Sequence, residues 1–151
     1  MPAPVGIPIP AQLVSNLVTS AFVLCLLPAS VACLAGLGIA WPALAPAFRR
    51  PELRGLALVT AVMPMTSVIF AFVVAFLAAD WALSDNVLLA FAAVAALTVL
   101  IQAFVTRARF PTVVADPNAF GKFLIMVVWP EVLVILALMW IVVAQAPQTT
   151  A

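Results

Sequence analysis

Apolar residues fill four long stretches of this chain, and the charged residues gather between those stretches. The stretches cover residues 13–47, 53–79, 86–106 and 119–146. Each exceeds the roughly 20 residues that an α-helix needs to cross the hydrocarbon core of a bilayer. Helix is the form expected there, because an open strand would leave its backbone groups unpaired in lipid. The pattern therefore predicts an all-α membrane protein with four transmembrane helices.

The first stretch is longer than a membrane span requires, and it contains Pro28, Pro42 and Pro46. A proline inside a helix removes one backbone hydrogen bond and crowds the preceding turn, so it kinks or ends the helix. The sequence thus predicts either a kink near Pro28 or a helix end near Pro42.

The composition fits a chain that is surrounded by lipid. Hydrophobic residues make up 68% of it and charged residues only 7%, whereas soluble domains carry about 25% charged residues. The net charge of +1 argues against a nucleic-acid surface. The chain has no histidine, so no zinc site and no cofactor are expected. Cys25 and Cys33 share one apolar stretch and are interpreted as small apolar residues.

The charges alternate between the two sides of the predicted bundle. All six basic residues flank the first and third connections: Arg49, Arg50, Arg54, Arg107, Arg109 and Lys122. Asp80 and Asp85 occupy the second connection. Basic connections of membrane proteins lie on the cytoplasmic side. We therefore expect the basic loops in the cytoplasm, and both termini outside.

An internal repeat appears when the sequence is shifted by 66 residues. Without a gap, the shift aligns Pro51 with Pro117, Gly55 with Gly121, Leu58 with Leu124, Pro64 with Pro130 and Ile69 with Ile135. Two prolines and a glycine in register favour a duplicated helical hairpin, although chance between two apolar helices is the alternative. The predicted organisation is an extended lead-in at 1–12, a first hairpin at 13–79, a second hairpin at 80–146 and a tail at 147–151. The lead-in has no Lys or Arg, so no secretory signal is expected.

Glu131 is the candidate functional residue, because it lies about a dozen residues inside the fourth apolar stretch. An ionised side chain at the bilayer centre costs on the order of 3 kcal/mol on insertion scales, and such residues commonly mark ion pathways. A carboxyl at this depth can wait protonated and ionise when it meets a cation or a water path. A polar contact between helices is the alternative for Glu131, and also for Gln102 in the third stretch.

Each copy of the repeat has a proline in mid-span, but only one copy has a carboxylate. Pro130 leaves the carbonyl of Met126 without its helical partner, and Pro64 does the same to Thr60. Glu131 follows Pro130, whereas Met65 follows Pro64. The duplicated unit therefore has one carboxylate where its symmetry allows two.

Residues 116–144, with the segment MVVWPEVLVILALMW, resemble the fourth helix of a known family, and residues 50–70, with MPMTSVIF, resemble its second helix. That family is the proteolipid ring subunit of V/A-type rotary ATPases, called c or K, in its two-hairpin form. The resemblance implies a ring of identical copies that turns against a stator, with H⁺ or Na⁺ carried on Glu131. It also implies a stator arginine, central-stalk subunits at the cytoplasmic loops, and a bacterial or archaeal cytoplasmic membrane.

The resemblance also implies a set of ion ligands beside the carrier glutamate. In sodium-binding members these correspond to Gln102, to Thr66 and to the backbone carbonyl of Met63, with Ser67 where such members have glutamine. Phe70 stands where they have a tyrosine. The set for Na⁺ is therefore incomplete, although Na⁺ at these residues stays open beside H⁺.

The sequence departs from the family in its glycine content. Ring subunits pack their inner helices through repeated small residues, but here the first span has only Gly36 and Gly38, and the third has no glycine. This favours an unusually packed ring, and leaves two alternatives open. One is a c-like structural or assembly subunit that does not pump, and the other is a small four-helix transporter. The chain shows no nucleotide-binding loop and no Ser/His/Asp set, so we expect no ATP hydrolysis by the chain itself.

Overall fold

The computed structural model describes residues 19–81 and 83–145. The predicted lead-in at 1–12 and the tail at 147–151 lie outside the described residues. Within the described part the chain is helical, and four helical segments are long and apolar enough to span a membrane. These are Thr19–Phe48, Pro51–Ala78, Asp85–Ala115 and Pro117–Ala144. The prediction of an all-helical membrane protein with four spans is confirmed at this level.

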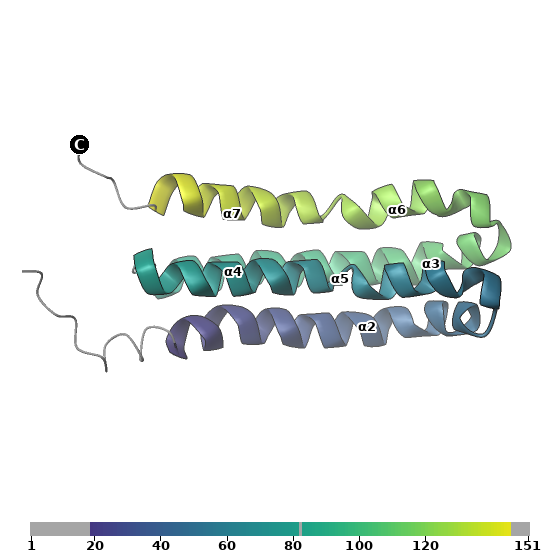
Figure 1. The fold of residues 1–151 in the computed structure, drawn as a ribbon, viewed down its shortest axis with the longest axis horizontal. Helices are drawn as coiled ribbons and strands as arrows, with labels where there is room; N and C mark the ends of the chain where they lie inside the picture. The colour runs from purple at the N-terminus through teal and green to yellow at the C-terminus, as the bar shows by residue number, and fades with distance from the viewer. Residues whose placement is uncertain (1–18, 82, 146–151) are drawn as a thin grey trace, which may run out of the picture.

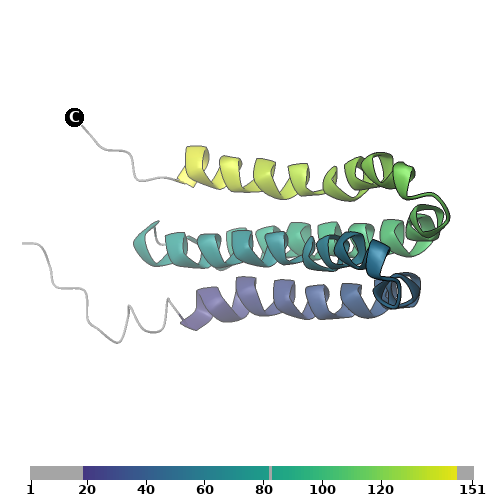
Figure 2. The same ribbon diagram turned by 45° about the vertical axis from the view of Figure 1, so that its right-hand side comes forward.

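The spans are built from several helical elements. In chain order they are η1 (Phe22–Leu26), α2 (Leu27–Phe48), α3 (Pro51–Val62), α4 (Met65–Trp81), α5 (Asp85–Ala115), η2 (Pro117–Ala119), α6 (Phe120–Val128) and α7 (Glu131–Gln145). Figure 1 shows the spans side by side, with the α2–α3 and α5–α6 connections at one end of the bundle. The turned view in Figure 2 shows the same arrangement, with the end of α4 at the opposite end. Below, the end with the α2–α3 and α5–α6 connections is called the loop end.

The first span is irregular near Pro28 and continuous past the later prolines. A single π-helical turn, Phe22–Leu26, precedes Pro28, and the backbone N–H of Leu27 bonds to the carbonyl of Phe22. The wider turn accommodates a proline that has no N–H to donate. Helix α2 then continues through Pro42 to Phe48, so the alternative of a helix end near Pro42 is wrong.

The core of the bundle consists of two apolar clusters separated by polar residues. The first cluster includes Cys25, Ala71, Val74, Phe91, Ala95, Val134 and Ile141. The second cluster lies toward the loop end and includes Leu44, Leu53, Ala57, Phe110, Val113, Phe123 and Val127. Along α3, α4 and α5, buried polar residues lie between the two clusters. They are Thr60, Ser67, Thr98, Gln102 and Thr106. We call these five residues the middle layer.

Helix α5 is the central element, because it contacts every other span. It packs tightly on α2 at Gly36, where an added Cβ would lie 2.8 Å from Cγ1 of Val99. Small residues let membrane helices pack this closely. At Gly38, by contrast, an added Cβ would meet nothing within 4 Å. Only one of the two glycines that the sequence singled out in this span therefore serves helix packing.

The variant Gly36→Ala tests this contact. We expect it to lower the free energy of unfolding by about 1–3 kcal/mol, because Val99 is buried and has little room to move. Gly38→Ala is the matched control and should be neutral or slightly stabilising, since alanine favours helix. Denaturant unfolding in detergent micelles measures both. Equal stability of the two variants would contradict the close contact, and adding Val99→Ala to Gly36→Ala should recover part of the loss.

Candidate functional site

The fourth span is broken at Pro130, in the middle of its length. Helix α6 ends at Val128 and α7 begins at Glu131. The last regular bond runs from the N–H of Trp129 to the carbonyl of Ile125, at 3.0 Å. Beyond the break, Val132 donates to the carbonyl of Trp129 at 3.2 Å, a tighter turn than the α-helix makes. The cause is local, because Pro130 has no N–H to continue the ladder.

The second span is broken in the same way at Pro64. Helix α3 ends at Val62 and α4 begins at Met65. The N–H of Thr66 bonds to the carbonyl of Met63 at 3.1 Å. The two breaks are therefore 66 residues apart, which is the spacing of the sequence repeat.

Two side chains of α5 bond to backbone carbonyls on either side of the Pro130 break. Nε2 of Gln102 donates to the carbonyl of Val127 at 3.1 Å. The hydroxyl of Thr98 donates to the carbonyl of Pro130 at 3.3 Å. Thr98 and Gln102 are four residues apart and so share one face of α5. Helix α5 thus holds both halves of the broken span.

The same amide group reaches the carboxyl of Glu131. Nε2 of Gln102 lies 3.0 Å from Oε1 of Glu131, so its second N–H donates there. Gln102 is fully buried, whereas Glu131 is half-buried. The structure therefore brings together the two residues that the sequence placed 29 positions apart.

The break also changes the surroundings of Glu131 in a way that the sequence analysis missed. Glu131 is the first residue of α7. The N-terminus of a helix carries partial positive charge, which stabilises a negative group there by about 0.3–1 kcal/mol. The carboxyl thus has one hydrogen-bond donor from α5 and a favourable position at the start of its own helix.

The orientation of the Gln102 amide follows from its neighbours. The carbonyl of Val127 can only accept, so the NH₂ group must face it. The oxygen of the amide, Oε1, is then buried without a hydrogen-bond partner in the described part of the chain. Leaving such an oxygen unpaired costs about 1–3 kcal/mol. The two hydrogen bonds donated by Nε2 offset this cost and keep the amide in this orientation.

The three remaining predicted ligands lie in the second span, and two of them are bonded to each other. The hydroxyl of Thr66 donates to the carbonyl of Met63 at 2.7 Å. Ser67 is fully buried, and its hydroxyl has no partner among the described residues. A serine in a helix commonly bonds to the carbonyl four residues earlier, which here is Met63 and already accepts from Thr66. No hydrogen bond in the described ranges joins Thr66, Met63 or Ser67 to Glu131.

Thr98 is the site residue that the sequence analysis did not select. Its hydroxyl is fully buried in the middle layer and bonds across to the broken span. A signal was present, because a threonine four residues before a glutamine in an apolar stretch places two polar groups on one face. Its target, a backbone carbonyl, has no signature in the sequence.

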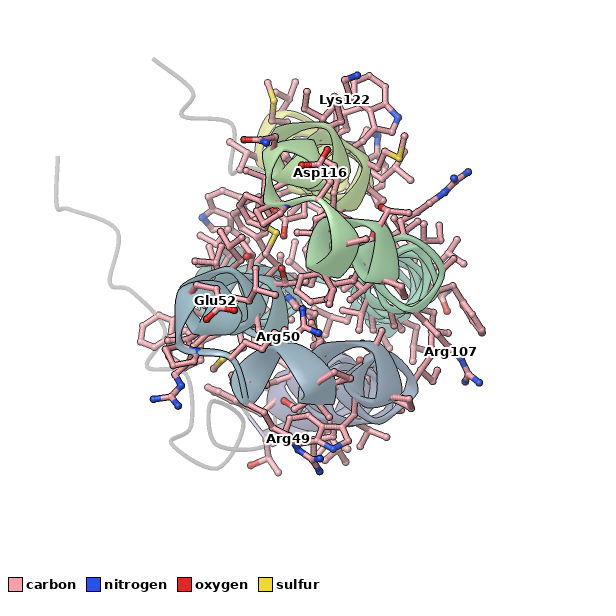
Figure 3. The ribbon with its side chains drawn as sticks, turned by 90° about the vertical axis from the view of Figure 1, so that its right-hand side faces the viewer. Arg49, Arg50, Glu52, Arg107, Asp116 and Lys122 are labelled. Carbon is pink, nitrogen blue, oxygen red and sulfur yellow. The ribbon has the colours of Figure 1, made fainter. Side chains whose placement is uncertain are left out.

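The charged residues form a separate surface at the loop end. Figure 3 looks onto this end and labels Arg49, Arg50, Glu52, Arg107, Asp116 and Lys122. The predicted stalk-facing residues Arg49, Arg50, Arg54, Arg107 and Arg109 are all exposed. Arg54 donates to the carbonyl of Phe48 at 3.3 Å, which ties α3 to the end of α2. The first and third connections therefore present their basic residues at one end of the bundle.

Comparison with known proteins does not assign the chain to a family. No protein-family model matches the chain, and no curated protein gives a significant match. Support for a function therefore comes from the site itself and from the resemblance of its sequence.

Substitutions in α5 should rank by the number of bonds that they remove. Thr98→Val removes one interhelical bond and should cost about 0.6 kcal/mol of unfolding free energy, the average for membrane bundles. Gln102→Met removes two bonds and should cost about 1–2 kcal/mol. Thr112→Val is the control, because the Thr112 hydroxyl bonds within its own helix at an exposed site. Unfolding in detergent micelles gives the order, and equal stability of all three variants would contradict the bridging role of α5.

Proposed function

We propose that this chain is an ion-translocating rotor ring subunit of a V/A-type ATPase or ATP synthase, with Glu131 as the carrier of H⁺ or Na⁺. The observation that carries the proposal is the half-buried carboxyl of Glu131, which is bonded to the buried amide of Gln102 beside a mid-span helix break. Intramembrane carboxyls in polar surroundings commonly mark ion pathways.

The chemistry of the carrier follows from its position. A carboxylate that takes up a cation becomes neutral, and a neutral group can face hydrocarbon at much lower cost than a charge. Glu131 is accessible at the surface of the bundle, whereas Gln102 is buried behind it. Gln102 therefore holds the loaded side chain in place, and an arginine of a stator subunit releases the ion.

The proposed assembly is a ring of identical copies, each made of two tandem duplicated hairpins. The breaks at Pro64 and Pro130, separated by the repeat spacing, support the duplication. The close packing of α2 on α5 at Gly36 supports an inner pair of helices. In this arrangement α3–α4 and α6–α7 form the outer helices, which leaves Glu131 facing lipid or the stator.

The basic loop end gives the proposed orientation. It faces the cytoplasm by the positive-inside rule, and its exposed arginines meet the central-stalk subunits. Both termini then lie outside, in a bacterial or archaeal cytoplasmic membrane. ATP hydrolysis belongs to other subunits of the complex, so the chain is a non-catalytic subunit.

A second candidate is a c-like structural or assembly subunit without pumping. It is favoured by Met65, which is 51% exposed at the position that the repeat pairs with Glu131. A small four-helix transporter would need polar groups around a cavity within one chain. One of the larger hollows among the described residues lies between α5 and α7 and is lined by apolar residues such as Phe91, Val94 and Trp140. A closed ring seen by electron microscopy would exclude the single-chain transporter.

Reaction with a hydrophobic carbodiimide tests the carrier role. The reagent modifies protonated carboxyls within membranes, so we expect one label per chain, at Glu131. Glu131→Gln should abolish both labelling and ion transport by the complex. Glu52→Gln is the matched control at the water-exposed loop end and should leave both unchanged. If Glu131 is not labelled by the reagent and Glu131→Gln leaves ion transport intact, the rotor proposal is wrong.

The single carboxylate also predicts the coupling ratio. One carrier per four helices halves the ions moved per helix in each turn of the ring. Fewer ions per ATP favour pumping against a steep gradient, so we expect ATP-driven transport in sealed vesicles. Ion and ATP counts on such vesicles measure the ratio. A ratio typical of one carrier per hairpin would count against this stoichiometry.

A further inference from the structure

The amide of Gln102 is fixed by two acceptors at once. The carbonyl of Val127 takes one N–H at 3.1 Å, and Oε1 of Glu131 takes the other at 3.0 Å. In an unbroken helix Val127 would accept from the N–H of Glu131. The break at Pro130 leaves this carbonyl to the side chain of Gln102. The direction of the amide thus depends on the break in the span.

Turning the amide over would be unfavourable on both sides. It would place the oxygen of Gln102 against the carbonyl of Val127, which can never donate, and against the carboxyl of Glu131, which can donate only when it is protonated. The bond to Val127 would be lost in either state of the carrier, and the bond to Glu131 would be lost in its ionised state. Gln102 therefore presents N–H, and not oxygen, to the carrier.

An N–H donor in this position disfavours binding of a metal cation at the carboxyl but is compatible with its protonation. Hard cations such as Na⁺ are held by several oxygen atoms from carboxylates, carbonyls and hydroxyls. An N–H directed at the carboxyl carries partial positive charge where the ion would bind. A proton needs only one carboxyl oxygen, and the other oxygen can still accept from Gln102.

The oxygen atoms predicted as ligands are not gathered around Glu131 in the described part of the chain. The hydroxyl of Ser67 is buried without a partner there, and it makes no hydrogen bond to Glu131. The carbonyl of Met63 accepts both the N–H and the hydroxyl of Thr66. Phe70 has no oxygen on its side chain. Of the predicted ligands in the described part of the chain, Gln102 is therefore the one that bonds to Glu131, and it does so through N–H and not through oxygen.

We propose that Glu131 carries H⁺ and not Na⁺, and that Gln102 sets this selectivity because the freed carbonyl of Val127 holds its NH₂ group toward the carrier. The inference rests on the proposed function and narrows it to one ion. Gln102 is in this sense a selectivity-determining residue that acts through a hydrogen bond to the carrier.

The charged residues on the elements packed against α7 lie away from Glu131 along the chain. The elements packed against α7 are α5 and α4. On α5 the charged residues Asp85, Arg107 and Arg109 are exposed and lie toward its ends, and on α4 the charged residue is Asp80, one position before its last. The titratable groups of the first span are thiols, and Cys25 donates to the carbonyl of Ala71. Within the described middle layer, Glu131 is thus next to uncharged groups.

The test is carbodiimide labelling of the full chain across a range of pH, in NaCl and in KCl at equal ionic strength. We expect the labelling rate to fall as pH rises, because the carboxyl loses its proton, with the same rate in both salts at every pH. A slower rate in NaCl alone would overturn the proton assignment and leave the carrier role of Glu131 intact. No labelling of Glu131 at any pH in either salt would overturn the proposed function itself.

The variant Pro130→Ala tests the role of the Val127 carbonyl. It returns the missing N–H, so the helix can close and Val127 can accept from Glu131 again. Gln102 is then free to turn its oxygen to the carrier, and we expect protection of Glu131 by Na⁺ to appear. Pro64→Ala at the other break is the matched control and should stay indifferent to Na⁺. Continued indifference in folded Pro130→Ala would overturn the assigned role of Val127.

A measurement on the unmodified sequence keeps the test independent of that variant. The chain has four glutamines, so ¹⁵N-glutamine labelling gives few side-chain NMR signals, and Gln102→Met assigns the one of interest. We expect the NH₂ protons of Gln102 to shift with pH, as Glu131 loses its proton, and to be unchanged by NaCl. A shift caused by NaCl and not by KCl would overturn the proposal.

Discussion

The structure depends on one constraint, which is that every backbone polar group inside a hydrocarbon layer must find its partner within the protein. Pro130 removes one N–H from the fourth span, and the helix responds by breaking into α6 and α7. The carbonyls of Val127 and Pro130 then bond to Gln102 and Thr98 of α5. The same amide that satisfies the backbone also reaches Glu131. The candidate ion site therefore lies where side chains of α5 bond to both sides of the break.

The position of the site follows from the layering of the core. Apolar clusters occupy both halves of the bundle, and the buried polar residues lie between them. The two clusters pack α5 against its neighbours on either side of the middle layer. The contact of Gly36 with Val99 brings α2 onto α5 at the same level. Close packing behind the middle layer thus fixes the side chains that face Glu131.

The two breaks share their local chemistry but differ in what completes them. At Pro64 the side-chain hydrogen bond beside the break stays within the span, since the hydroxyl of Thr66 donates to the carbonyl of Met63. At Pro130 the side-chain bonds come from another helix, and they reach a carboxyl as well as carbonyls. The repeat pairs Gln102 with Gly36, so the first hairpin has a packing contact where the second has an amide. Among the described residues, the second copy thus combines a carboxylate with a donor from another helix.

The sequence by itself determined the four spans and the two proline breaks, because these depend on local hydrophobicity and on the missing proline N–H. The pairing of Glu131 with Gln102 was implied by the family resemblance. The sequence overestimated Pro42, which α2 passes without ending, and it gave Gly36 and Gly38 equal weight. Only the tertiary structure decided that Thr98 belongs to the site, that Thr66 bonds within its own helix, and that the amide of Gln102 presents N–H to Glu131. The physical reason is that each of these depends on which backbone carbonyl lies opposite a side chain. A carbonyl is the same in every residue, and only packing decides which one is left without a partner and which helix supplies the donor.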